Sequence, residues 1–168
     1  TGSSVFQTTP LRESIKLVSN FPSAVKGIIS TDTANIFINN GSALLKSDGS
    51  SLLNFHGIKS MVYEPFAKSI YLSVPQRQMV LRITDMKSEP EFISVNGIGD
   101  HLAIDSLYGT LCWSGFDARS ISCGDLHGRR EPERIWKSKP WSNERIIGIA
   151  MDENDHKLCT ITRNGGKG

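Results

Sequence analysis

Three acidic residues recur at the ends of three apolar stretches of the chain. Glu64 closes the run M-V-Y-E, Asp105 closes L-A-I-D and Asp152 closes I-A-M-D. Oxygen ligands that converge on one point are what a hard divalent cation requires, so the three carboxylates could form a metal site for a hydrolase. A carboxylate at a strand end can instead accept hydrogen bonds from the backbone of the following turn. We favour the second interpretation and predict turn residues with no bound metal or cofactor.

A second acidic set and the four histidines give no stronger sign of catalysis. Asp48 lies in an Asp-Gly pattern and Asp125 in an Asp-x-x-Gly pattern, both typical of turns, and Asp85 is the equivalent of Asp125 in the repeat. The sequence contains no nucleophile elbow and no H-E-x-x-H motif. The histidines are expected to be solvated loop residues and not members of a catalytic triad: His56, His101, His127 and His156.

The three cysteines, Cys112, Cys123 and Cys159, do not have the spacing of a zinc site. Cys112 and Cys159 occupy equivalent positions in two similar strands, where we expect them to fill sheet interfaces as small apolar groups. The alternative is a disulfide between Cys112 and Cys123 across a hairpin centred near Asp117. That bridge requires the two cysteines to form a non-hydrogen-bonded pair.

Three further features bear on recognition. Residues 40–42, N-G-S, form an N-glycosylation sequon in a predicted turn, which makes Asn40 a candidate for a glycan. Residues 129–134, R-R-E-P-E-R, mix charges and predict a solvated loop in place of a nucleic-acid site. Trp113 and Trp136 are expected to be buried, whereas Trp141 follows a proline in a polar linker and is a candidate interface anchor.

The elements that would position these residues repeat along the chain. Residues 81–88, L-R-I-T-D-M-K-S, align with residues 121–128, I-S-C-G-D-L-H-G, at an offset of 40 positions. Upstream, residues 69–73 align with residues 110–114 at an offset of 41, and residues 157–161 resemble both. A repeat of about 40–45 residues made of short strands is typical of β-propeller blades. The sequence therefore predicts an all-β propeller with four-stranded blades.

At about 42 residues a blade, the chain of 168 residues holds roughly four blades. We expect residues 1–22 to be a tail or a strand of a preceding blade, and residues 23–168 to be a partial propeller. Its predicted units span about residues 23–55, 58–96, 98–142 and 145–168. Hairpin turns are expected at Asn40-Gly41 and Asp48-Gly49, and no long helix is expected. Continuous apolar runs at residues 28–29, 36–38 and 146–150 predict strands buried on both faces.

The bulk composition excludes several classes of protein. Hydrophobic residues make up 38% and charged residues 21% of the chain, as in ordinary globular proteins. The net charge of +2 gives no overall attraction to nucleic acid or to acidic membranes. No apolar run reaches the ~20 residues of a membrane span. Because the sequence begins T-G-S-S without an initiator methionine, we expect it to be a piece of a longer protein.

The repeat unit resembles the class B, or YWTD, repeat of low-density lipoprotein receptors. The resemblance lies in residues 102–105 (L-A-I-D), 111–114 (L-C-W-S) and 121–128, and again in residues 149–152 and 158–160. The tetrads at residues 71–74 (Y-L-S-V) and 112–115 (C-W-S-G) lack the terminal aspartate of that family. Such degenerate propellers resemble those of Sevenless/ROS-type receptor tyrosine kinases. The resemblance implies a six-bladed extracellular propeller, of which this chain is about two thirds.

The sequence thus favours a non-catalytic protein-recognition module in the extracellular part of a cell-surface receptor. Its partner would be a protein ligand or co-receptor, and this segment would neither bind nucleic acid nor insert into the membrane. A kinase domain elsewhere in the full-length protein is compatible with the resemblance. The alternatives are a metal-dependent propeller hydrolase and an intracellular propeller scaffold, although Trp-Asp and Gly-His signatures of WD repeats are missing. Similarity of fold alone does not establish any of these functions.

Overall fold

The computed structural model describes residues 3–8, 15–21, 24–31, 36–84, 89–127 and 129–164. In this part of the chain every regular element is a β-strand except one short 3-10 turn, η1 (Pro75–Arg77), so the expectation of no long helix is confirmed. The strands are β1 (Ser3–Thr8), β2 (Ile15–Phe21), β3 (Gly27–Ser30), β4 (Ile36–Asn39), β5 (Ala43–Lys46), β6 (Ser51–Asn54), β7 (Met61–Glu64), β8 (Ser69–Val74), β9 (Met79–Thr84), β10 (Glu91–Ser94), β11 (Ile98–Asp105), β12 (Thr110–Gly115), β13 (Ser120–Asp125), β14 (Glu133–Lys137), β15 (Glu144–Asp152) and β16 (Lys157–Asn164).

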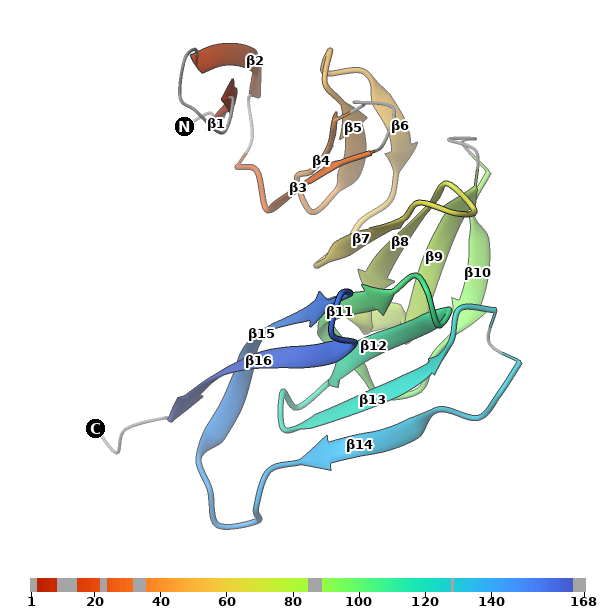
Figure 1. The fold of residues 1–168 in the computed structure, drawn as a ribbon. Coiled ribbons are helices and arrows are strands. Elements are labelled where there is room, and N and C mark those ends of the chain that lie inside the picture. The colour runs from red at the N-terminus through yellow and green to blue at the C-terminus, as the bar shows by residue number, and fades with distance from the viewer. Residues whose placement is uncertain are drawn as a thin grey trace.

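The strands form three four-stranded antiparallel sheets, β3–β6, β7–β10 and β11–β14, each in chain order. Two two-stranded sheets, β1–β2 and β15–β16, lie before and after them along the chain. The first strands are neighbours, because β3 contacts β7, β7 contacts β11 and β11 contacts β15. Figure 1 shows the sheets following one another in an arc, with these first strands on its inner side. The predicted all-β architecture with four-stranded blades is confirmed, and we call each four-stranded sheet a blade.

Two predicted hairpin turns lie in the first blade. Asn40 and Gly41 connect β4 to β5, and Asp48 and Gly49 connect β5 to β6. Gly41 has φ +86° and Gly49 has φ +85°, a left-handed conformation that glycine adopts without steric cost. Both turn predictions are therefore confirmed.

The hydrophobic core lies between the blades. All six residues of β8 are buried. Its residues Ile70, Leu72 and Val74 pack in a cluster with Leu44 of the first blade. Tyr71 points to the other side of the sheet and packs with Trp113 of the third blade. A strand between two other sheets is covered on both faces, which explains why residues on both faces of β8 are buried.

The prediction that β15 is buried on both faces is wrong. Ile146 is 2% exposed, whereas Ile147 is 51% exposed, and Ile161 of the paired strand β16 is 64% exposed. The β15–β16 sheet contacts β11 and β12, and no described strand covers its other face. Ile28 of β3 is likewise half exposed, and the side chains of residues 36–38 lie outside the described set.

Antiparallel pairing gives each blade two distinct ends. One end, which we call the linker face, carries the turns between second and third strands and the connections between blades. Backbone hydrogen bonds join these segments, as from Gly57 N–H to Gly41 O (2.9 Å) and from Phe116 N–H to Gly97 O (2.8 Å). The linker face comprises residues 24–26, 40–42, 55–60, 75–78, 95–97, 116–119 and 138–143. The opposite end, the turn face, comprises the described residues of 47–50, 65–68, 89–90, 106–109, 126–132 and 153–156.

Candidate functional site

The three carboxylates of the first acidic set end the first strands of successive sheets. Glu64 ends β7, Asp105 ends β11 and Asp152 ends β15. Each accepts hydrogen bonds from backbone N–H groups of the following turn: Phe66 (2.8 Å) and Ala67 (2.7 Å) for Glu64, Tyr108 (3.1 Å) for Asp105, and Asn154 (3.1 Å) for Asp152. Within the described residues, no group of three or more His, Cys, Asp or Glu side chains could hold a metal ion. These contacts favour the turn interpretation over the cation site.

One of these carboxylates also joins two neighbouring sheets. Asp105 Oδ2 lies 2.9 Å from Nδ1 of His156, whose ring packs edge-on against Tyr108 with the centroids 4.3 Å apart. The hydroxyl of Ser106 donates to Glu153 Oε1 at 2.9 Å. The turn after β11 is therefore tied to the equivalent turn after β15.

The prediction of a solvated His156 is wrong, because equivalent turns of adjacent sheets lie side by side and bring this ring to Asp105. His56 and His127 are exposed, as expected. His101 is half-buried, and burial lowers its pKa despite the opposing effect of Asp100.

The Asp105 contact predicts a pH-dependent stability. Burial raises the pKa of Asp105, but hydrogen bonds from Tyr108 N–H and His156 outweigh it and hold the pKa below its ordinary value of 3.8. A lowered folded-state pKa contributes stability above the unfolded pKa, and this contribution is lost as the pH falls through the folded value. We expect Asp105→Asn to lower the free energy of unfolding by about 1–2 kcal/mol near neutral pH and by less in acid.

Urea unfolding of wild type and variant across this pH range measures the difference. Asp155→Asn is the matched control, because Asp155 is exposed and, among the described residues, its side chain forms an ion pair with the exposed Lys157 alone. Its expected effect is below about 0.5 kcal/mol. A loss in Asp105→Asn that stays constant from neutral to acid pH would contradict the assignment.

The second acidic set organises turns. The Asp125 carboxylate accepts the N–H groups of His127 (2.8 Å), Arg129 (3.2 Å) and Arg130 (2.7 Å). Burial raises the pKa of Asp125, and these backbone hydrogen bonds outweigh it and lower the pKa. Asp48 accepts the hydroxyl and N–H of Ser50, which lower its pKa. Asp85 lies outside the described residues.

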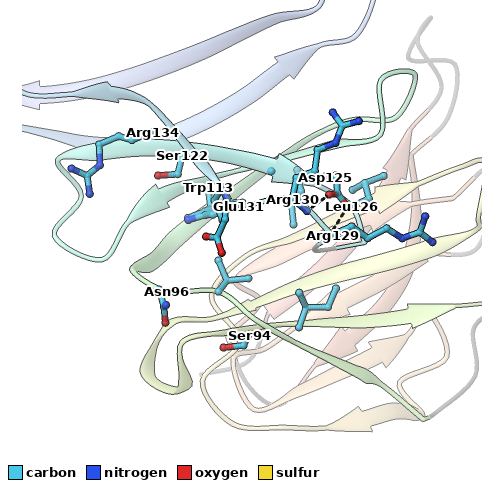
Figure 2. A pocket seen from close by; sticks show the side chains of 15 residues that line it. Ser94, Asn96, Trp113, Ser122, Asp125, Leu126, Arg129, Arg130, Glu131 and Arg134 are labelled. Carbon is cyan, nitrogen blue, oxygen red and sulfur yellow. Dashed lines mark hydrogen bonds between the residues drawn. The ribbon is translucent and has the colours of Figure 1, made fainter.

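A cavity of about 480 Å³ lies where the second and third blades meet (Figure 2). Its apolar wall includes Val95, Leu111 and Trp113, and the loop between β13 and β14 borders it. Residues 129–134 are exposed, as predicted, but only residues 129–132 belong to the loop, since Glu133 and Arg134 begin β14. Figure 2 shows the guanidinium groups of Arg129 and Arg134 extending outward to opposite sides.

Cys112 and Cys123 form a disulfide in the structure, with an S–S distance of 2.02 Å. They are direct partners in the pairing of β12 with β13, and their Cα atoms lie 4.1 Å apart. This short separation is typical of the non-hydrogen-bonded type of antiparallel pair, the type that the bridge requires. The expectation that both Cys112 and Cys159 fill interfaces is wrong for Cys159, a free and exposed cysteine on the uncovered β15–β16 sheet.

Asn40 lies at the β4–β5 turn, on the linker face. Its Oδ1 accepts the N–H groups of Ser42 (2.9 Å) and Ala43 (2.8 Å). An N-linked glycan is attached to Nδ2 and leaves Oδ1 as an acceptor, so this turn geometry is compatible with modification.

The three tryptophans differ in exposure. Trp113 is 4% exposed between the second and third blades, Trp136 is half-buried, and Trp141 is 80% exposed on the linker face. The predicted exposure of Trp141 is therefore confirmed.

Arg119 holds the loop that carries Trp141. Its Nη2 donates to the carbonyl oxygens of Lys139 (3.0 Å), Pro140 (3.4 Å) and Ser142 (2.5 Å), and its Nε donates to Ser138 Oγ (3.0 Å). This role could not be predicted from the sequence, because the contacts join positions about 20 residues apart. Arg82 was missed for the same reason: it contacts Glu91 at 2.5 Å and His127 Nδ1 at 3.0 Å, and so connects two blades.

Comparison with solved structures agrees with this architecture. A chain of the nidogen/laminin complex superposes with a TM-score of 0.59 at 18% identity, over 79% of this chain and 51% of that one. Virginiamycin B lyase from Staphylococcus aureus gives 0.70 at 14% identity, over 94% and 56%. The extracellular domain of a hybrid two component system from B. thetaiotaomicron gives 0.62 at 16% identity, over 97% and 21%. The chain is a partial β-propeller.

At these identities the similarity concerns the fold alone, and the proteins that share this propeller fold include both binding proteins and a lyase. The propeller chain spans only 51% and 56% of the first two structures. No protein-family model matches it, and no curated protein matches it. Among the described residues, no helix has the length and apolar character needed to cross a bilayer.

Proposed function

We propose that this propeller is a non-catalytic protein-recognition module. The observation that carries the proposal is Trp141, a large aromatic side chain that is 80% exposed on a loop fixed by four hydrogen bonds from Arg119. Exposed tryptophans on rigid loops are efficient interface anchors, since they bury a large area on binding and lose little conformational entropy. The propeller core holds such loops in place while their sequences vary.

We further propose an extracellular location in a cell-surface receptor. The Cys112–Cys123 disulfide supports an oxidising compartment, and the Asn40 sequon supports secretion. The resemblance to the YWTD repeat and to Sevenless/ROS-type receptors supports the receptor context and a complete ring of six blades. The similar extracellular domain of a two component system offers a precedent for a propeller outside a cell. The expected partner is a protein ligand or co-receptor.

A binding screen tests the recognition proposal. The secreted chain is labelled and tested against purified extracellular proteins, and hits are measured again with single loop variants on both faces. We expect a saturable partner whose affinity falls when loop residues of one face are changed. Binding that appears only after unfolding, or a hit that no loop variant weakens, would contradict the proposal. Stoichiometric divalent metal together with a chelator-sensitive hydrolase activity would favour the enzyme alternative.

The extracellular proposal predicts a glycan on Asn40. We expect protein secreted from eukaryotic cells to carry excess mass that a glycosidase removes, and both Asn40→Gln and Ser42→Ala to abolish it. Intact-mass spectrometry measures the change. Asn143→Gln is the control, since Asn143 precedes Glu144 and Arg145 and lacks a sequon. Secreted wild-type protein without the added mass would contradict the prediction.

A further inference from the structure

The two ends of the propeller differ in charge. The loops of the linker face carry five basic residues and one acidic residue: Lys26, Lys59, Arg77, Arg119, Lys139 and Asp117. The described loops of the turn face carry three basic and five acidic residues: Lys68, Arg129, Arg130, Asp48, Glu89, Glu131, Glu153 and Asp155. The last residues of the strands that end at the turn face add four more carboxylates and one basic residue: Glu64, Asp105, Asp125, Asp152 and Lys46. The small net charge therefore conceals a basic face and an acidic face.

The basic face also presents two exposed aromatic side chains. Trp141 is 80% exposed and Phe116 is 66% exposed. Both belong to segments joined by Arg119, since Phe116 lies in the β12–β13 turn that contains Arg119 and Trp141 lies in the loop that Arg119 binds. Lys139 is exposed beside them and forms no ion pair within the described residues. Apolar anchors beside an exposed lysine, on a face whose loops carry a surplus of positive charge, fit a partner that offers apolar groups among carboxylates.

Arg119 lies in the β12–β13 turn and is bound to the loop after β14, so we assign it no direct contact with a partner. Its guanidinium uses its fixed set of donors on three carbonyl oxygens and one hydroxyl oxygen. A lysine ammonium at this position would keep the charge, but it could not reproduce the hydrogen bonds that Nε and Nη2 of Arg119 donate. Arg119 is thus a positioning residue for Trp141.

The exposed side chains of the β15–β16 sheet do not belong to this surface. Arg145 and Arg163 are direct partners in that sheet, and their exposure follows from the absence of a described strand over its outer side. Phe116, Lys139 and Trp141 lie instead in loops at the end of a complete four-stranded blade.

We propose that the linker face binds an acidic segment of the partner protein, with Trp141 and Phe116 as apolar anchors and Arg119 as the residue that positions Trp141. The inference rests on the proposed recognition function and adds the chemistry of the partner. Attraction between the basic face and an acidic segment raises the association rate, while burial of the aromatic rings slows dissociation. The turn face, with its surplus of carboxylates, would repel the same segment.

A labelled synthetic peptide of glutamate and aspartate with interspersed leucine and phenylalanine is the probe, and its lysine-substituted counterpart is the control peptide. Fluorescence anisotropy measures binding to the full chain at increasing salt. We expect the acidic peptide alone to bind, and its affinity to fall as salt screens the charges. Trp141→Ala should weaken binding about tenfold, and Lys139→Glu should weaken it several-fold. Arg129→Glu, the same charge change on the turn face, should leave the affinity within about twofold.

Arg119→Lys tests whether Arg119 acts through the hydrogen bonds that position Trp141 or through its positive charge, because the variant keeps the charge and loses the hydrogen bonds. We expect it to weaken binding as much as Arg119→Ala does and to speed amide hydrogen exchange in residues 138–143, whereas Trp141→Phe should retain part of the affinity. Equal weakening by Lys139→Glu and Arg129→Glu, or equal binding of both peptides, would overturn the proposed surface. A protein partner from the screen that is sensitive to Arg129→Glu and insensitive to Trp141→Ala would also overturn it, and would leave the recognition function standing.

Discussion

Trp113→Ala should lower the free energy of unfolding by about 3–5 kcal/mol, the range for removal of a buried large aromatic side chain. Trp113 is 4% exposed and packs in one cluster with Tyr71 of the second blade and Leu126 of its own blade. Since the core lies between blades, the loss of this ring removes contacts that hold two sheets together. We expect a lower denaturation midpoint in guanidinium, measured by circular dichroism.

Trp141→Ala is the matched control for this experiment. The same ring is removed, but from a position that is 80% exposed, so the change in unfolding free energy should stay within about 0.5 kcal/mol. The pair of variants separates a structural tryptophan from a binding tryptophan on one scaffold. If both variants lost the same stability, the interblade position of Trp113 would be contradicted.

Removal of the disulfide should have the next largest effect. The Cys112→Ala/Cys123→Ala double variant opens a loop with a sequence separation of 11 residues. Loop-closure entropy for a loop of this size gives an expected loss of about 2–3 kcal/mol in unfolding free energy. Urea unfolding of oxidised wild type and of the double variant measures this loss.

Cys159→Ala serves as the control, because Cys159 is free and exposed, and its replacement should change the stability little. Peptide mapping of wild-type protein without reductant should recover one peptide pair joined through Cys112 and Cys123. Recovery of all three thiols free in secreted protein would contradict both the bridge and the stability prediction. Such a result would also weaken the extracellular proposal.

The propeller architecture was largely predictable from the sequence. The offsets of 40 and 41 residues between equivalent strands reflect a unit that cannot bury its apolar surface alone, so each unit must stack against the next. Turn chemistry is similarly local, because glycine in a left-handed conformation at Gly41 and Gly49 needs no distant contact. The acidic residues at the ends of β7, β11 and β15 are local features too, as their backbone hydrogen-bond partners lie two or three residues ahead.

The candidate site was less predictable, because its contacts depend on strand register or join residues far apart in the sequence. The burial of His156 follows from a tertiary contact, because the turn after β15 lies against Asp105 of the neighbouring sheet. Cys112 and Cys123 could pair only if the β12–β13 register placed them directly opposite each other, and a shift of one residue would have turned them to opposite faces. The exposure of Ile147 depended on whether another strand covers β15.

By itself, the sequence determined the all-β class, the blade repeat, the turn positions and the exposed tryptophan, because periodicity and turn propensity act over a few residues. Only the tertiary structure decided which faces of the strands are covered and which end of the propeller collects positive charge. It also decided that Arg119 fixes the loop of Trp141, since four hydrogen bonds across about 20 residues leave no mark on local sequence.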